Sequence, residues 1–189
     1  KDLIKLKKFM EGKPVAEQDI GNQLLAETKA YVESSVCRRR LLLHYFGEHY
    51  GEENCHRCDN CLHPHEYIEA TKEVLKVLKV IHAIKGKFKI DNVVNIMMGV
   101  ESEEVTSHCH EQLPEFAAGA SREPQYWYAL IKQGILSGYI EKEVENYGLL
   151  KVTKAGKKFM AMPEPFYFKE NNEFGDYEPE PEEGTAVLD

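Results

Sequence analysis

Apolar residues recur every three to four positions along most of this 189-residue chain, which is the spacing of amphipathic helices. The clearest example covers residues 66–85, where isoleucines and leucines fall on or near one stripe and lysines lie largely away from it. The same spacing predicts helices over residues 1–13 and 17–35. A further helix is predicted over "CRRRLLLHYFGE", residues 37–48, where Gly47 is a natural stop.

Shorter helices are predicted farther along the chain. Asp91 is expected to cap a helix over "NVVNIMM", and another helix is predicted over "SEEVTSHCHEQL", residues 102–113. Ser121 and Pro124 then mark the start of a strong helix. Trp127 falls on the apolar stripe of that helix, so we expect it in the core.

The pattern changes to alternation after Gly138. "YIEKEVE" and "LLKVT" are predicted to be two strands joined by the turn "NYG", and "KAGKKFM" is predicted to be a last short helix. A helix-turn-helix followed by a two-stranded hairpin is a winged helix. The predicted fold is therefore mainly α with a small β-hairpin, in which a helical hairpin precedes a winged helix (helix-turn-helix plus wing).

Four of the five cysteines lie close together, and three of them form the motif "CHRCDNC". Structural Zn2+ takes four soft or borderline ligands in a tetrahedral arrangement, and a C-x2-C turn can place two thiolates on one ion. A cysteine near a helix start and beside arginines, as in "CRRR", is biased towards the thiolate form. The predicted ligands of a structural zinc ion in the helical hairpin are Cys37, Cys55, Cys58 and Cys61.

Other interpretations of the cysteines stay open at this point. If Cys37 were an ordinary buried cysteine, a histidine could complete the site, and the candidates are His56, His63 and His65. A redox C-x2-C motif belongs with a βαβ pattern, which is absent here. An iron–sulfur cluster is the stronger rival, although no fourth cysteine follows closely. The "HCH" at residues 108–110 is a weak candidate for a second metal site, because adjacent helix residues point in different directions.

The acidic charge is concentrated at the C-terminal end of the chain. The formal net charge is −8, and residues 164–189 carry nine acidic residues and one lysine. The remainder is neutral, so bulk charge neither supports nor excludes nucleic-acid binding. Residues 164–189 are predicted to be a disordered linker or tail. No apolar run is long enough to span a membrane. Because the chain begins at Lys1 rather than a methionine, we interpret it as part of a longer protein.

"CRRRLLLHYFGE" followed by "CHRCDNC" resembles the zinc-binding subdomain of RecQ-family DNA helicases, and the winged-helix order after it agrees. The resemblance implies four regions. Residues 1–20 would be the tail of a helicase motor lobe, 21–63 the zinc-binding helical subdomain, and 64–163 the winged helix. Residues 164–189 would be a linker.

By the same resemblance, the chain would be the DNA-binding C-terminal region of a 3′–5′ ATP-dependent DNA helicase in repair or recombination. Zinc would be structural, and the partners would be duplex or fork DNA and the protein's own motor, with no membrane. ATP and Mg2+ would belong to that motor, because this chain has no Walker A loop and no ATPase motif. The resemblance also implies a cytoplasmic, nucleoid-associated protein of bacterial type.

The candidate DNA contacts are basic residues near helix starts and the wing, together with polar and aromatic neighbours. Helix N-termini and lysines suit phosphate contacts, and an aromatic residue at the wing tip could stack on a terminal base pair. For any single lysine a solvated face is the better explanation, and the lysines favour DNA binding only as a cluster. Ser121 could be only a cap, and Tyr147 could pack back on the hairpin. The candidates are Lys85, Lys87, Lys89, Ser121, Arg122, Gln125, Tyr128, Tyr147, Lys151, Lys154 and Lys157.

Two other classes of function remain. A zinc-knuckle winged-helix transcriptional regulator should bind a defined DNA sequence as a dimer. A winged helix used as a protein-interaction module should not bind DNA at low salt. A helicase fragment should instead show little sequence preference and a clear salt dependence.

Overall fold

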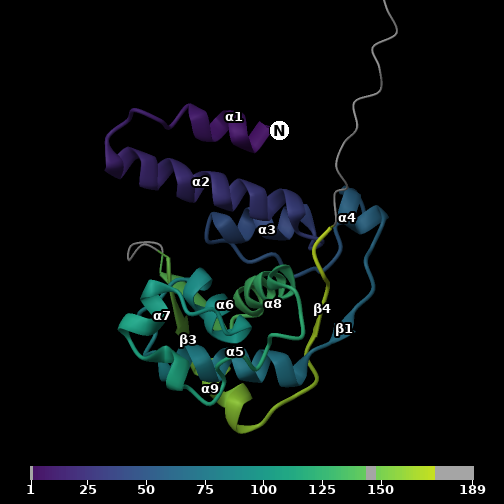
Figure 1. The fold of residues 1–189 in the computed structure, drawn as a ribbon. Coiled ribbons are helices and arrows are strands. Elements are labelled where there is room, and N and C mark those ends of the chain that lie inside the picture. Colours follow the sequence, from purple (N-terminus) through teal and green to yellow (C-terminus); the bar gives the residue numbers. More distant parts are fainter. Residues whose placement is uncertain (1, 144–147, 173–189) are drawn as a thin grey trace, which may run out of the picture.

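The computed structural model describes residues 2–143 and 148–172. The described chain forms two layers, a helical layer from the N-terminal third and a winged helix beneath it (Figure 1). The helices of the first layer are α1 (Asp2–Lys8), α2 (Val15–Glu33), α3 (Arg38–Tyr45) and α4 (Asp59–Leu62). None of the described helices is long and apolar enough to cross a bilayer.

The second layer is built from helices around a small hairpin. Its helices are α5 (Thr71–Ala83), α6 (Ile90–Met98), α7 (Glu103–Ser107), the 3-10 turn η1 (His110–Gln112), α8 (Pro124–Leu136) and α9 (Lys154–Ala161). The wing is the antiparallel pair β2 (Ile140–Glu143) and β3 (Leu149–Val152). The predicted fold class, mainly α with a small hairpin in a winged helix, is confirmed.

A second antiparallel pair joins segments that are far apart in the sequence. Strand β1 (Ile68–Glu69) lies at the side of the winged helix and pairs with β4 (Tyr167–Phe168), which follows the last helix. In Figure 1, β4 runs from the winged helix up towards α4. The end of the described chain therefore returns to the first layer.

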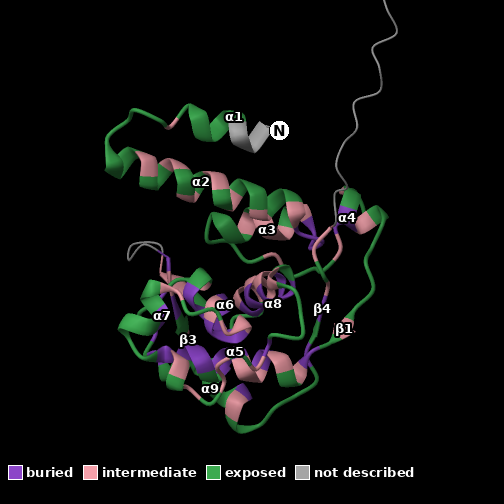
Figure 2. Ribbon diagram, viewed as in Figure 1, coloured by how far each residue is buried: buried purple, intermediate pink, exposed green. Residues whose placement is uncertain are grey.

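The hydrophobic core belongs to the winged helix. Every buried member of the main apolar cluster lies between Ala70 and Phe168, and the first layer shows few buried residues in Figure 2. Trp127 is 1% exposed, and its indole nitrogen donates to the Gly119 carbonyl at 3.1 Å, which confirms its predicted place in the core. Gly99 closes α6 with φ of 74°, where an added Cβ would approach Ala117 Cβ to 2.7 Å.

Several local predictions were wrong for identifiable reasons. The helix expected over residues 66–85 begins at Thr71, because the preceding residues pair with β4. The helix expected over residues 102–113 breaks at Cys109, whose φ of 55° is left-handed and ends α-helical hydrogen bonding. Lys89, not Asp91, holds the cap position of α6. Part of the segment expected to be a disordered tail forms β4.

Candidate zinc centre and nucleic-acid interface

The four predicted zinc ligands meet at one point of the first layer. Their sulfur atoms all lie within 4.8 Å of one another, and the site is formed by Cys37, Cys55, Cys58 and Cys61. Four sulfurs at about 2.3 Å from one ion are about 3.8 Å apart in a tetrahedron. The Cys55 and Cys61 sulfurs are 3.9 Å apart. The donor set and its spacing therefore fit a closed tetrahedral zinc site.

Local structure explains how each cysteine reaches the site. Cys37 is the cap residue of α3 and Cys58 that of α4, so both stand at helix N-termini, while Cys61 lies inside α4. His56 adopts a left-handed φ of 55°, which turns the chain between Cys55 and Cys58. The predicted position of Cys37 at a helix start is confirmed.

The surroundings of the sulfurs differ along the knuckle. Backbone N–H groups of Arg57 and Cys58 donate towards Cys55 and lower the pKa of its thiol to about 6. Burial raises the pKa of the Cys61 thiol to about 12 in the metal-free protein. A bound zinc ion supplies the positive charge that keeps all four sulfurs as thiolates.

An ion pair fastens the two ligand-bearing helices together. Arg38 at the start of α3 donates from its guanidinium to Asp59 of α4, with the closest approach at 2.8 Å, and also contacts the Tyr31 carbonyl. This pair lowers the pKa of the Asp59 carboxyl, because the carboxylate form accepts the hydrogen bonds. The residues that follow Cys37 and Cys58, Arg38 and Asp59, thus form an ion pair that links α3 to α4.

The histidine and "HCH" alternatives find no geometric support among the described residues. His56, His63 and His65 are exposed and lie outside the four-sulfur cluster. His108 and His110 stack with ring centroids 5.5 Å apart, and both pack edge-on against Phe88. Within the part of the chain that the structure describes, the four cysteines are the one group arranged to hold a metal ion.

The candidate DNA contacts among the described residues form two groups, one at the turn after α5 and the wing, and one at the start of α8. Lys85, Lys87 and Lys89 are exposed on the turn after α5. The Leu150 amide donates to the Phe88 carbonyl at 3.0 Å, so this turn lies beside strand β3. The structure therefore brings the turn next to Lys151.

The remaining wing-side candidates sit on or near α9. Lys154 and Lys157 are exposed on that helix, which Thr153 caps by accepting from the Gly156 amide at 3.0 Å. Lys151 is ion-paired with Glu143 across the hairpin. Tyr147, the candidate at the wing tip, lies outside the described residues.

The second group surrounds the start of α8. Ser121, Arg122 and Gln125 are exposed there, and the Arg122 guanidinium lies over the Tyr126 ring at 4.9 Å. Tyr128 is half-buried and donates from its hydroxyl to Asp91 at 2.6 Å. Burial, with that hydrogen bond, raises the pKa of Tyr128. Tyr128 is therefore committed to the link between α8 and α6.

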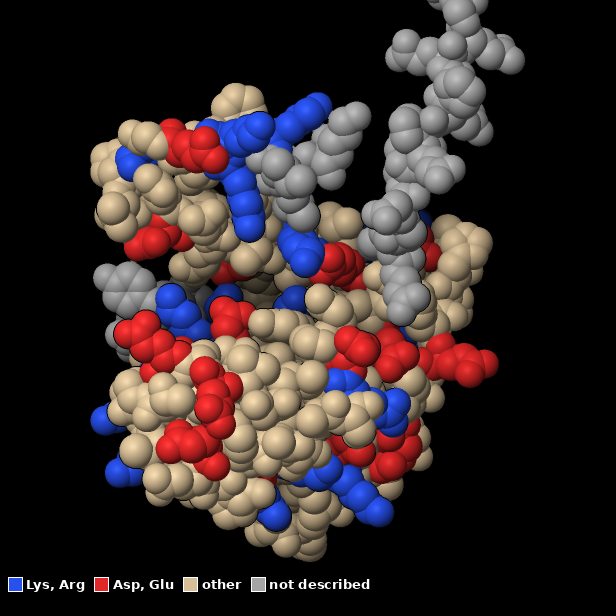
Figure 3. Space-filling view, viewed as in Figure 1, with Lys and Arg blue, Asp and Glu red and all other residues tan. Residues whose placement is uncertain are grey.

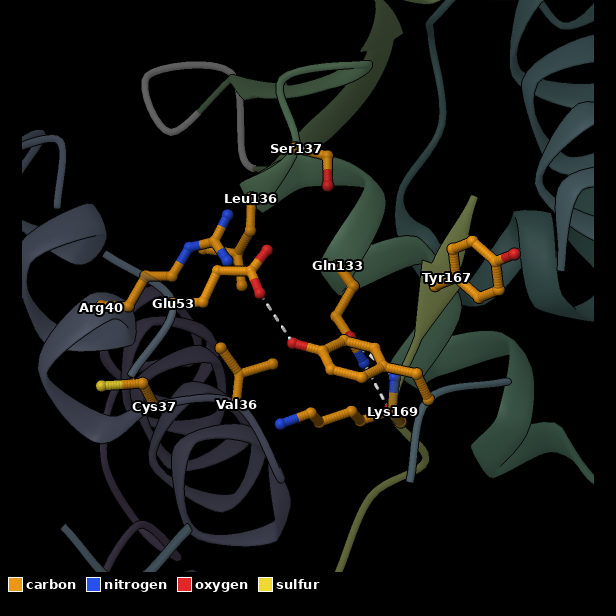
Figure 4. Close-up of a pocket in the computed structure, with 10 residues that line it drawn as sticks. Val36, Cys37, Arg40, Glu53, Gln133, Leu136, Ser137, Tyr167 and Lys169 are labelled. Atoms are coloured by element: carbon orange, nitrogen blue, oxygen red, sulfur yellow. Dashed lines mark hydrogen bonds between the residues drawn. The ribbon is translucent and has the colours of Figure 1, made fainter. Parts of the chain in front are cut away.

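The body of α8 is covered on its outer side, which the sequence alone did not reveal. No residue from position 126 to 136 is exposed. In Figure 4, Gln133 and Leu136 of α8 face Val36 and Arg40 of the first layer across a small cavity. Burial lowers the pKa of Lys132 on the same helix, and the negative charge of Glu33 on α2 partly offsets that shift. A lysine on an otherwise apolar stripe was the only sequence signal of this interface.

The arrangement defines a class of protein: a winged helix carried on a closed four-cysteine zinc subdomain. Comparison with known families agrees. Residues 64–175 match the model of the RQC domain, and residues 1–62 match that of the RecQ zinc-binding domain. The chain belongs to the RQC domain family and joins that domain to a RecQ zinc-binding domain, so its zinc is structural.

Similar curated proteins carry helicase names. The chain is 29% identical over 136 residues to the ATP-dependent DNA helicase RecQ of Pasteurella multocida, which covers 71% of this chain and 21% of that protein. The RecQ helicase of Haemophilus influenzae is 27% identical over 162 residues, covering 85% and 26%. The helicase hus2/rqh1 of Schizosaccharomyces pombe is 26% identical over 149 residues, covering 74% and 11%. The chain thus spans about a quarter or less of each relative.

Proposed function

We propose that this chain is the region of a RecQ-like 3′–5′ ATP-dependent DNA helicase that binds duplex DNA beside the unwinding fork, during repair or recombination. The observation that carries the proposal is the union of a closed four-thiolate site with a winged helix in the RQC family. ATP hydrolysis would be performed by a motor that this chain does not contain. Such a protein would act at the nucleoid.

The zinc ion would have a scaffolding role, with Cys37, Cys55, Cys58 and Cys61 as its ligands. All four positions of a tetrahedral ion are taken by sulfur, so no position is left for a catalytic water. The ion joins the starts of α3 and α4, and α2 and α3 lie over the outer side of α8. Zinc would therefore hold the layer against which the winged helix rests.

The DNA surface that we propose has two parts. One is the lysine edge, by which we mean Lys85, Lys87 and Lys89 of the winged helix, and the other is the start of α8. Lys85, Lys87 and Lys89 lie just after α5, and Lys76, near the middle of α5, donates to the Ala118 carbonyl before the start of α8 at 3.2 Å. The seven residue steps from Lys76 to the end of α5 at Ala83 span about 10 Å, or about three base pairs at 3.4 Å each. Both groups could thus meet phosphates of one duplex.

The covered body of α8 favours phosphate contacts at the lysines and the start of α8 over insertion of α8 into the major groove. A regulator that reads a defined sequence places its recognition helix in the major groove. Here the C-terminal part of that helix, at Gln133 and Leu136, faces the first layer, and no residue from position 126 to 136 is exposed. On the face drawn in Figure 3, basic and acidic side chains are interspersed, so that face shows no continuous basic patch.

The first layer would also contact the motor domain of the helicase. Helix α2 has no buried residue, and apolar side chains are strongly exposed on it and just after α1, with Ile20 at 61% and Phe9 at 72%. Exposed apolar surface of this kind marks a contact with another domain. Ile20→Ser should change the stability of the isolated chain by under about 0.5 kcal/mol but destabilise the full-length protein by about 1–3 kcal/mol. Glu17→Ser, on the same helix, is the control, and equal effects of Ile20→Ser in both proteins would refute the docking.

DNA binding is tested by fluorescence anisotropy with duplex, forked and single-stranded DNA at two salt concentrations. We expect a preference for duplex or fork, weak sequence dependence, and weaker binding at higher salt. Lys85→Ala with Lys87→Ala should lower affinity for every sequence and reduce the salt slope by about two. Lys8→Ala with Lys13→Ala removes the same charge from the first layer and is the matched control.

Three results would point away from the proposal. Tight binding to one sequence by a dimer would identify a transcriptional regulator. No binding to any DNA at low salt would favour a protein-interaction module. An equal loss of affinity in the two double variants would show that the lysine edge has no special role.

A further inference from the structure

The chain that follows the winged helix returns along the boundary between the two layers. The Ala70 amide donates to the Phe166 carbonyl at 2.8 Å, and β4 then pairs with β1. The Lys169 amide donates to the Gln133 side chain of α8 at 2.9 Å, and the Lys169 ammonium lies over the Tyr67 ring at 4.5 Å. We call residues 166–172 the return segment. It is fastened to the winged helix along its length.

The return segment ends at the turn that carries Cys37. The backbone amide of Asn172 donates to the Glu33 carbonyl at 2.7 Å, and its side-chain amide donates to the Ser34 carbonyl at 3.0 Å. These carbonyls belong to the last turn of α2, whose final carbonyl groups have no partner within the helix. Asn172 therefore closes the C-terminal end of α2 immediately before Cys37.

Asn60 joins the same network from the cysteine knuckle. It lies between Asp59 and Cys61 and is 5% exposed. Its side-chain amide donates to the Ser34 carbonyl at 2.7 Å and to the Val36 carbonyl at 2.8 Å. Its own oxygen accepts from the Asn172 side chain at 3.0 Å. Both protons of the Asn60 amide and its oxygen are thus used.

We propose that Asn172 and Asn60 are positioning residues of the zinc centre, so that the chain beyond the winged helix supplies outer-shell support to a metal site more than 100 residues earlier. This inference rests on the assignment of the four cysteines as zinc ligands. Asn60 ties the knuckle to the Cys37 turn, and Asn172 ties that turn to the winged helix. Outer-shell hydrogen bonds of this kind hold ligands in place and slow metal loss.

The network also links the zinc centre to the position of the winged helix. The return segment contacts α8 through Gln133 and the α2 end through Asn172. By linkage, anything that detaches the segment from one partner weakens its hold on the other.

The test is the rate at which zinc is lost to excess chelator, followed with a colorimetric zinc indicator. Asn172→Ala should raise that rate about tenfold. Asn172→Asp should raise it at least as much, because a carboxylate would face the Ser34 carbonyl and the Asn60 oxygen with no proton to donate. Asn171→Ala is the matched control, since the Asn171 side chain makes no hydrogen bond among the described residues. It should stay within about twofold of the parent.

Two further measurements separate positioning from loss of the fold. The Co2+-loaded Asn172→Ala protein should keep the absorption bands of a tetrahedral four-thiolate site, and near-ultraviolet dichroism of Trp127 should be unchanged. Asn60→Ala combined with Asn172→Ala should accelerate release by less than the product of the single effects, because the two side chains share a hydrogen bond. Multiplicative effects would show two independent residues instead.

Release at the parent rate in Asn172→Ala, or equal acceleration in Asn171→Ala, would overturn the inference while leaving the zinc site intact. The ligand assignment fails separately. It fails if the parent protein holds no zinc, or if Cys37→Ser and Cys58→Ser bind it as before.

Discussion

Removing the zinc ion should unfold the first layer and spare the winged helix. Cys37→Ser deletes one of four thiolates, and structural zinc sites of this type contribute about 10–16 kcal/mol of apparent binding free energy at neutral pH. The first layer has little else to hold it: neither α2 nor α3 contains a buried residue, and the main apolar cluster begins at Ala70. The winged helix retains its whole core.

The size of the effect follows from the helix content of the two layers. About two fifths of the described helical residues lie in α1 to α4, so far-ultraviolet dichroism at 222 nm should fall by about that fraction. The cooperative thermal unfolding transition of the winged helix, followed by Trp127 fluorescence, should still be observed. Cys109→Ser is the control, because Cys109 is exposed and lies outside the cluster. Unchanged helix content after chelation, or loss of the Trp127 transition, would refute the reasoning.

Three further predictions concern the winged helix. Trp127→Ala should cost about 3–5 kcal/mol in urea unfolding, because it empties a site that is 1% exposed; Trp127→Phe should cost less. Thr153→Ala should cost about 1–2 kcal/mol by removing the α9 cap, and Thr153→Ser should restore most of it. Burial lowers the pKa of His110, so the unfolded chain takes up this proton first as pH falls below about 6.5. Stability present above that pH should therefore decline below it, and His110→Asn should lessen the decline between pH 7.5 and 5.5 in urea titrations, whereas exposed His65→Asn should not.

Much of the local structure was readable from the sequence because it depends on short-range physics. The cysteine spacing predicted the four-sulfur cluster, because C-x2-C turns bring Cys55, Cys58 and Cys61 together by local geometry and the ligand preference of zinc pointed to Cys37 as the fourth sulfur. The apolar stripe of α8 predicted the burial of Trp127, and alternation after Gly138 predicted the wing. The failures came where distant segments compete. Residues 68–69 leave the predicted helix because β4 offers them a strand partner, and Cys109 breaks its helix with a left-handed backbone.

The sequence by itself determined the four cysteines that meet in space, the winged-helix order and the family resemblance. Only the tertiary structure decided what lies against what. It covered the body of α8 with the first layer, committed Tyr128 to Asp91, and brought Asn172 to the turn before Cys37. Periodicity and motif spacing report contacts within about one turn of helix or one hairpin. Contacts between residues a hundred positions apart depend on how whole layers pack, and no local pattern encodes that packing.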